Sequence, residues 1–315
     1  MGKNTATRTG SRENGKEEEA VHCFSHQAMA TLYQVFISHP DAEYSRQAAR
    51  RAFQCLDVLE QDLSRFIENS DVSRISHAVV GERLILGEAT MECLQMAVIA
   101  YLETAGAFDI TLGSGMESIQ LDPDNMTVEI LATGLCLDLG GIGKGYAIDR
   151  MANELRDWDI TRFLIHGGQS SVLAAGAPYG KTGWGLRLGM PGAREVELLR
   201  LEAENLVVSG SGLEKGEHII DPHRGIPVKE KSAIWVWAEA DPEGYCFSNA
   251  FHRQQTILIN AAMVDALSTA FMVMDLTEIE AFCQKHPRIQ TMVINSRDQT
   301  SEPAVYRFGT NPPPV

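Results

Sequence analysis

The chain has 315 residues, enough for one large domain or two modest ones, and its hydrophobic content of 44% is typical of a globular protein. Its formal net charge of −15 opposes binding to nucleic-acid phosphates. The longest apolar runs fall far short of the roughly 20 residues that a membrane-spanning helix needs. We therefore expect no nucleic-acid partner and no membrane span.

The two ends of the chain are polar. Residues 1–22 contain no apolar signal-peptide core, and the tail reads GTNPPPV. We expect a disordered segment over 1–22, one domain over 23–308 and a flexible tail over 309–315. The six cysteines are scattered without a CxxC pair, which favours reduced thiols. This predicts a cytoplasmic protein, or a periplasmic one if a leader precedes the sequence given.

Hydrophobic spacing and turn residues predict the elements of the first half of the chain. Apolar residues recur at three- and four-residue spacing in the expected helices, and glycine clusters mark the loops. In chain order we expect a strand over 29–38, a helix over 41–66, a break at 70–76, a helix over 88–104, a glycine-rich loop over 106–115, and short strands over 127–131 and 135–138.

The second half is read in the same way. In chain order we expect a helix over 143–156, a strand–turn–strand unit over 162–176, strands near 184–188, 197–201, 205–209 and 232–238, helices over 261–274 and 277–285, and a strand over 290–295. Strands and helices mix without strict alternation. The order therefore favours an α+β fold with a mixed sheet over a doubly wound α/β fold.

The stretch DLGGIGKGYAID, residues 138–149, places four glycines and one lysine between two carboxylates. A P-loop would need glycine where Asp138 stands and Ser or Thr where Gly145 stands, and a dinucleotide fingerprint would need glycine at Tyr146. Two interpretations remain. The stretch is either a helix N-terminus that binds phosphate, with Lys144 adding positive charge, or a tight strand-to-helix turn.

A second candidate lies in NAAMVDALSTAFMVMD, residues 260–275, which is apolar on nearly every side. Asp265 lies inside this segment, and Thr269 follows four residues later on the same helical face. A carboxylate and a hydroxyl at this spacing are hard oxygen ligands suited to Mg²⁺. The alternative is that Asp265 caps the helix. In GEHIIDPHRGIPV, His218 is a proton carrier, a contact to the edge of a flavin, or simply a satisfied polar residue.

Six segments, taken in order over about residues 25–300, together resemble one family. They read MATLYQVFI, LEQDLSRFIENSDVSRIS, GAFDITLG, DLGGIGKGYAID, VVSGSG followed by HIIDPHRGIPV, and MVDALSTAFMVM. This series resembles the ApbE family of flavin transferases. The resemblance implies an α+β fold with mixed, largely antiparallel sheets and flanking helices, forming one compact, T-fold-like unit of two lobes.

The resemblance also implies an activity. Members of the family bind FAD and Mg²⁺, transfer FMN to a threonine hydroxyl of an acceptor flavoprotein, and release AMP. Some members instead hydrolyse FAD to FMN and AMP. We therefore expect FAD as substrate, Mg²⁺ as cofactor and an acceptor flavoprotein as partner, with an FAD pyrophosphatase or a non-catalytic FAD-binding protein as alternatives.

The same resemblance assigns the site residues. It implies that the metal is held by Asp265, Thr269 and the backbone carbonyl of Gly143. It implies that FAD is contacted by Met29, Ala107, Phe108, Asp109, Asp138, Gly141, Lys144, Ile219 and Asp221. The attacking hydroxyl needs a proton acceptor; His218 is the first choice, and a carboxylate near the metal, such as Asp265, is the rival.

The chain departs from the family pattern at several positions. Gln169 stands where an acidic residue is common, and Ser76 where asparagine is typical. Ala30 replaces the glycine of the first motif, and Ile110 replaces a proline. The spacer before His218 is also short. None of these changes removes an expected metal ligand.

Overall fold

A computed structural model describes residues 20–190, 193–213, 219–241, 257–295 and 304–309. Its centre is a sheet of eight described strands in which each neighbouring pair is antiparallel. In sheet order these are β1 (Ala20–Ala28), β2 (Thr31–His39), β6 (Phe163–Gly167), β7 (Ser171–Ala175), β10 (Leu206–Gly212), β13 (Ala233–Glu239), β14 (Gln290–Asn295) and β15 (Ala304–Phe308).

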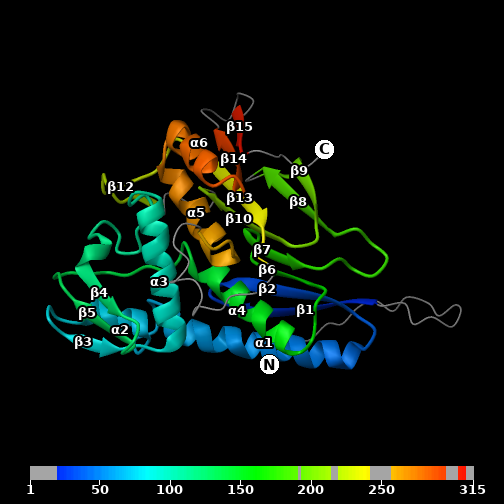
Figure 1. Cartoon of the computed structure of the whole chain (residues 1–315), viewed down its shortest axis with the longest axis horizontal. Helices are drawn as coiled ribbons and strands as arrows, with labels where there is room; N and C mark the ends of the chain where they lie inside the picture. Colours follow the sequence, from blue (N-terminus) through cyan, green and yellow to red (C-terminus); the bar gives the residue numbers. More distant parts are fainter. Residues whose placement is uncertain (1–19, 191–192, 214–218, 242–256, 296–303, 310–315) are drawn as a thin grey trace, which may run out of the picture.

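The two faces of this sheet are covered differently (Figure 1). One face packs against the long helices, which are α1 (Ala42–Leu63), α4 (Gly143–Asp157) and α5 (Ala261–Val273). The other face is covered by the hairpin of β8 (Trp184–Met190) and β9 (Ala193–Ala203). Val207 and Val208 are neighbours in β10, and they point into these two separate cores because side chains alternate along a strand.

A smaller lobe lies beside the helical face, at the left of Figure 1. It contains a three-stranded antiparallel sheet and two helices. Its elements are α2 (Asp71–His77), β3 (Arg83–Ile85), α3 (Glu88–Glu103), a 3₁₀ turn (Met116–Ser118), β4 (Ile119–Asp122) and β5 (Thr127–Ile130). The remaining described elements are the short hairpin β11 (Ile220–Asp221) and β12 (Ile226–Pro227), and α6 (Leu276–Lys285), which follows α5. The predicted α+β architecture with largely antiparallel sheets is confirmed.

Three local expectations were wrong. The stretch 70–76 was expected to be a non-helical interruption, but a helix begins at Asp71 with Ser70 as its N-cap. The stretch 135–138 was expected to be a strand but is irregular. Strand β1 begins at Ala20, inside the segment 1–22 that was expected to be disordered, because it pairs along its whole length with β2.

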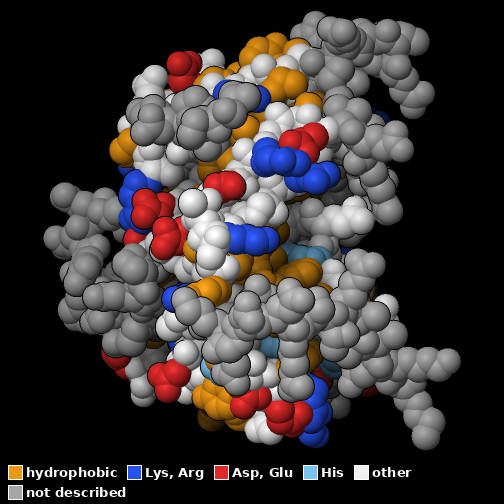
Figure 2. Space-filling model, turned by 90° about the vertical axis from the view of Figure 1, so that its right-hand side faces the viewer, with side chains coloured by type: hydrophobic (Ala, Val, Ile, Leu, Met, Phe, Trp, Pro, Cys, Tyr) orange, Lys and Arg blue, Asp and Glu red, His pale blue; other side chains and the backbone are white. Residues whose placement is uncertain are grey.

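Other expectations concern surfaces and thiols. Within the described ranges, no helix is both long and apolar enough to cross a membrane. The cysteines that the structure describes are free thiols, as expected. On the face drawn in Figure 2, acidic and basic side chains are interspersed rather than gathered by sign. The described side chains on that face therefore form no extended basic surface for nucleic acid.

Candidate functional site

The site is built around a buried carboxylate in the first half of α5. Asp265 is 1% exposed. Its Oδ1 accepts hydrogen bonds from Ser209 Oγ at 2.7 Å and from Ser171 Oγ at 3.2 Å. Asp265 does not cap the helix; Asn260 does, since its side chain accepts from the Met263 amide. The Asp265 carboxylate is therefore not used as a helix cap. Because it is buried, it needs polar partners inside the fold to offset its lost hydration.

The first turn of α4 supplies those partners. Lys144 Nζ lies 3.2 Å from Asp265 Oδ2, and the Gly145 amide donates to the same oxygen at 3.1 Å. The lysine side chain is 25% exposed, and its ammonium also donates to the carbonyl of Gly140. The glycine stretch and the apolar helix, separate candidates in the sequence, thus meet in space. A positive charge with access to solvent lies beside them.

The glycines of this stretch allow neighbouring segments to pack closely against the backbone. They are not needed for unusual backbone torsion, because none of the four has a left-handed φ. A Cβ at Gly145 would lie 2.2 Å from the carbonyl oxygen of Ala261. A Cβ at Gly141 would lie 3.0 Å from Thr269 Oγ1 and 3.1 Å from Phe108 Cε2. Gly145 therefore allows α4 and α5 to touch, and Gly141 keeps the space beside the threonine open.

Hydroxyl groups extend the site along α5. Thr269 Oγ1 lies 3.3 Å from Ser211 Oγ, which is 2.8 Å from Ser268 Oγ. Thr269 is partly exposed, whereas Gly143 is buried at the first position of α4 and next to Lys144. The three expected metal ligands thus lie on the two helices that meet at Lys144 and Asp265.

The donor set suits a hard divalent cation. The described residues contain no group of three His, Cys, Asp or Glu side chains placed to hold a metal. One carboxylate, one hydroxyl and a backbone carbonyl therefore leave most positions to water and to ligand oxygens. This is the arrangement that Mg²⁺ favours when it binds with substrate phosphates, so the residues fit the expected ion.

The loop 106–113 forms the next wall. Ala107 and Phe108 are buried, and Phe108 faces Gly141. The Asp109 carboxylate accepts from both the amide and the hydroxyl of Thr111, so it shapes its own loop. The amide of Asp138 donates to the carbonyl of Ile110 at 2.8 Å and so joins this loop to the glycine stretch.

Asp138 is held from two directions. Its Oδ1 accepts from the Gly140 amide at 2.8 Å, and its Oδ2 lies 3.1 Å from Arg65 Nη1. Next to it, the Leu137 amide donates to Ser76 Oγ at 3.1 Å. The serine at this departure from the family pattern therefore still fixes the segment that leads into the glycine stretch.

Met29 lies at the turn between β1 and β2 in a left-handed conformation, with φ of 48°. Its amide donates to Glu60 Oε1 at 2.7 Å, and its sulfur accepts from Tyr33 Oη. Burial raises the pKa of the Tyr33 phenol, and the Asp265 and Glu60 carboxylates raise it further. The Tyr33 phenol therefore links the Met29 sulfur to the electrostatic field of the buried carboxylate.

The hairpin of β11 and β12 carries the last two expected FAD contacts. Ile219 is buried, and its carbonyl accepts from the Val228 amide. Asp221 Oδ1 accepts from the amides of His223 and Arg224 and so stabilises the turn. His218 lies outside the described residues.

The tip of this hairpin meets the loop 106–113. A Cβ at Gly106 would lie 3.1 Å from His223 Cε1, and one at Gly113 would lie 3.1 Å from the carbonyl oxygen of Pro222. An open pocket of about 450 Å³ lies between the hairpin and the last turn of α5, with Asp221 in its lining. Its volume is that of a small-molecule site.

The family model for the ApbE family matches residues 29–251. The chain belongs to the ApbE family. A FAD:protein FMN transferase of Klebsiella pneumoniae (strain 342) is 25% identical over 245 residues, which cover 64% of this chain and 69% of that protein. One from Salmonella typhimurium is 24% identical over 255 residues, covering 67% of this chain and 71% of that protein.

Solved structures agree. The flavin transferase ApbE from Vibrio cholerae superposes with a TM-score of 0.75 at 18% identity, covering 92% of this chain and 98% of that one. The ApbE protein from Thermotoga maritima gives a TM-score of 0.76 at 20% identity, covering 92% and 97%. At these identities the likeness establishes the ApbE fold.

Sequence reasoning missed three residues at this candidate site. Ser171 and Ser209 donate to Asp265 from β7 and β10. Ser209 lies in the VVSGSG segment, which was the available signal for it. Asp149 closes the glycine motif, and its carboxylate accepts from the amides of Ala261 and Ala262 at the start of α5. Its position in the motif was the available signal. Burial raises the pKa of Asp149 to about 7, although the hydrogen bonds from the Ala261 and Ala262 amides act to lower it.

Proposed function

We propose that this chain transfers FMN from FAD to a threonine hydroxyl of an acceptor flavoprotein, with Mg²⁺, and releases AMP. The family membership and the names of the relatives support flavin transfer. The observation that carries the proposal is the contact between Lys144 Nζ and Asp265 Oδ2 beside Thr269. It gathers a carboxylate, a hydroxyl and a cationic side chain at the start of a helix.

Asp265, Thr269 and the carbonyl of Gly143 are the groups that would hold Mg²⁺. When bound, this ion supplies positive charge that stabilises the diphosphate and the departing AMP. Lys144 supplies a second positive charge at the same place. In the structure it neutralises Asp265, and a divalent cation at that carboxylate would leave the ammonium available to the diphosphate of FAD.

The positive end of the α4 dipole favours an anion in the same position, where the Gly145 amide already donates to Asp265. Gly141 has no side chain to block the approach, because a Cβ there would fill the space beside Thr269. Phe108 and Ala107 exclude water from the wall opposite. These residues bind and orient the diphosphate, while the Asp221 hairpin and the Met29 turn would contact other parts of FAD.

The threonine of the acceptor must lose a proton as it attacks. The oxygens of Asp265 already accept from Ser171, Ser209, the Gly145 amide and Lys144. These donors leave Asp265 little room to take a proton from the attacking hydroxyl, so His218 remains the first choice of proton acceptor.

The proposal is tested with the full chain, FAD, Mg²⁺ and candidate acceptor flavoproteins, each with a matched variant in which the target threonine is valine. We expect the acceptor to gain the mass of FMN less one water, with one AMP released per acceptor, and expect EDTA to stop both. AMP release that the acceptor neither accelerates nor needs would instead identify an FAD pyrophosphatase. Tight FAD binding without AMP release would identify a binding protein.

A further inference from the structure

Asp149 is a residue of α4 whose carboxylate acts at another helix. Its two oxygens accept from the amides of Ala261 at 2.9 Å and Ala262 at 2.8 Å, at the start of α5. The first amides of a helix have no partner within it. Asn260 satisfies the next two, through its side chain for Met263 and through its carbonyl for Val264. The N-terminus of α5 is therefore fixed to α4 by Asp149.

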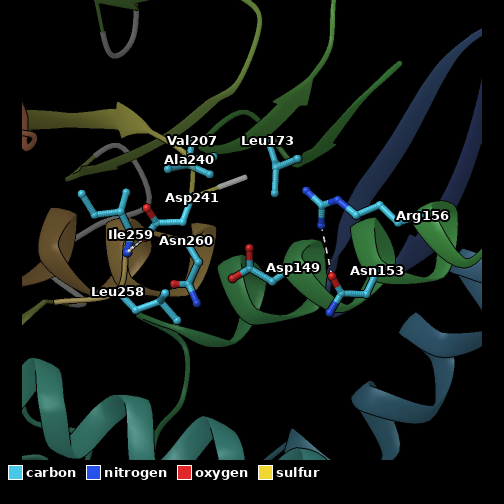
Figure 3. Close-up of a pocket in the computed structure, with 10 residues that line it drawn as sticks. All are labelled: Asp149, Asn153, Arg156, Leu173, Val207, Ala240, Asp241, Leu258, Ile259 and Asn260. Atoms are coloured by element: carbon cyan, nitrogen blue, oxygen red, sulfur yellow. Dashed lines mark hydrogen bonds between the residues drawn. The ribbon is translucent and has the colours of Figure 1, made fainter. Parts of the chain in front are cut away.

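The surroundings of Asp149 show why a charge is tolerated there. The side chain is buried and points into a small cavity between α4 and the start of α5 (Figure 3). The cavity has a volume of about 20 Å³, which is room for about one water molecule. Asn260, Asp241 and Arg156 also line it, and Arg156 donates to Asn153. This polar space and the positive end of the α5 dipole lower the cost of the buried carboxylate.

The same two helices meet again one turn away. The Gly145 amide and Lys144 Nζ contact Asp265 on α5, and the carbonyl of Ala261 occupies the space that a Gly145 Cβ would need. Asp149 and Gly145 thus hold α5 against α4 at two points, its start and its Asp265 turn. A shift at the first point would move Asp265 and Thr269 relative to Lys144, because a helix transmits displacement along its axis as a rigid element.

We propose that Asp149 is a positioning residue for the cation site: by holding the first amides of α5 it sets where Asp265 and Thr269 lie relative to Lys144. This proposal depends on the proposed function, which places the cation there. A serine would also cap a helix, but it offers one acceptor atom at a time. The carboxylate holds two adjacent amides at once and so fixes the direction in which α5 leaves α4.

The test compares Asp149→Ser with Asp275→Ser. Asp275 caps α6 and accepts from the Glu278 amide at 2.8 Å, and α6 carries no expected site residue. Both variants lose a capping carboxylate, so the control reports the general effect of a weakened cap. Binding of Mn²⁺ to the full chain is measured by the loss of its free EPR signal, without and with FAD. Hydrogen exchange is measured over residues 258–270.

We expect Asp149→Ser to weaken Mn²⁺ binding by roughly tenfold to 100-fold, as for other residues that support metal ligands, and to speed exchange at the start of α5. Asp275→Ser should leave both unchanged. Asp149→Asn, which keeps one carbonyl acceptor, is measured in the same way in case the serine variant folds poorly. Binding equal to that of the natural chain in a folded Asp149 variant would overturn the positioning role. Absence of Mn²⁺ binding by the natural chain, with and without FAD, would overturn the cation site as well.

Discussion

Lys144 Nζ lies 3.2 Å from Asp265 Oδ2, although the two residues are 121 positions apart in the chain. Asp265 is buried and the lysine is partly exposed. The pair is therefore asymmetric: the lysine can exchange its partner for a ligand, whereas the carboxylate cannot turn to solvent. Any cation that binds Asp265 from outside must compete with this ammonium, and the lysine must then take a new anionic partner.

The first prediction concerns Asp265→Asn. The amide keeps the shape of the side chain but brings a nitrogen next to donors at Ser209, Lys144 or Gly145. We expect turnover to fall by at least about 100-fold, because a metal ion contributes several kcal/mol to such reactions. FAD affinity should change only a few-fold, because most of the expected FAD contacts lie elsewhere. AMP release and FAD titration measure the two quantities.

The matched control is Glu92→Gln on α3. Glu92 is also buried, and it accepts from Tyr146 Oη at 2.6 Å and from Arg150 Nη1 at 2.7 Å. It makes an ion pair of the same kind as Asp265, but outside the expected site. Equal losses of turnover in the two variants would show that Asp265 matters for folding rather than for chemistry.

The second prediction uses two glycines of one motif. A Cβ at Gly145 would meet backbone atoms of Ala261 at 2.2 Å, so Gly145→Ala must push α5 away and should cost about 1–3 kcal/mol or more. A Cβ at Gly143 would find its nearest neighbour, Leu139, at 3.8 Å. Gly143→Ala should therefore stabilise the chain by about 0.5–1 kcal/mol, because alanine loses less entropy in a helix.

Urea unfolding of the two variants measures both changes. The informative result is that the two changes in unfolding free energy have opposite signs. Each substitution adds one methyl group, and the two positions are only two residues apart. Two variants of equal stability would contradict the close approach of α4 and α5 that Gly145 allows.

How far the sequence predicted this site depends on the range of each interaction. The pairing of Asp265 with Thr269 follows from helical spacing, and the turn at Lys144 follows from its glycines. The resemblance to one family placed both in a single site. Asp149 could not be predicted in the same way, because a carboxylate in an amphipathic helix usually faces water and its partners lie 112 and 113 positions away.

The errors in the fold have a similar origin. Strand β1 is mostly exposed on its outer edge and carries polar residues, and it becomes regular only because β2 pairs with it. The short helix at Asp71 depends on the Ser70 cap more than on apolar spacing. Local patterns predict elements that have their own buried face, whereas these two are fixed by a partner strand and a cap.

The third prediction concerns Ala30 at the β1–β2 turn. Met29 and Ala30 both have left-handed φ values, 48° and 56°, as in a two-residue hairpin turn that prefers glycine. An L-residue in this region costs roughly 1–2 kcal/mol, partly offset by the extra flexibility of glycine when unfolded. Ala30→Gly should therefore stabilise the chain by roughly 0.5–1 kcal/mol in thermal or urea unfolding.

Ala28→Gly is the control for this turn. Ala28 is buried at the end of β1 and is absent from the left-handed positions. Glycine there removes a buried methyl group and adds flexibility, so it should destabilise by about 1 kcal/mol. A loss of stability in both variants would indicate that the turn is not strained at Ala30.

The last prediction concerns pH. Burial raises the pKa of Asp149 to about 7 in the folded chain; the Ala261 and Ala262 amides and Arg156 act in the opposite direction, and Asp265 raises it further. The unfolded value is about 3.9. Between these values the unfolded chain releases its proton while the folded chain keeps it. The stability from this group is therefore complete below about pH 4 and is lost as pH rises through about 7.

The free energy of unfolding of the natural chain should accordingly fall relative to that of Asp149→Ser between pH 4.5 and 7.5, by an amount on the order of a few kcal/mol. Above pH 8 the two curves of unfolding free energy against pH should be parallel. Urea unfolding across this range provides the measurement, with Asp149→Asn expected to follow the serine variant. Parallel curves throughout would contradict the raised pKa of Asp149. A loss in the natural chain would mean that the ionised carboxylate is unfavourable for stability at neutral pH. Its advantage would then lie in the geometry it gives α5, a conflict between stability and activity that is common at functional sites.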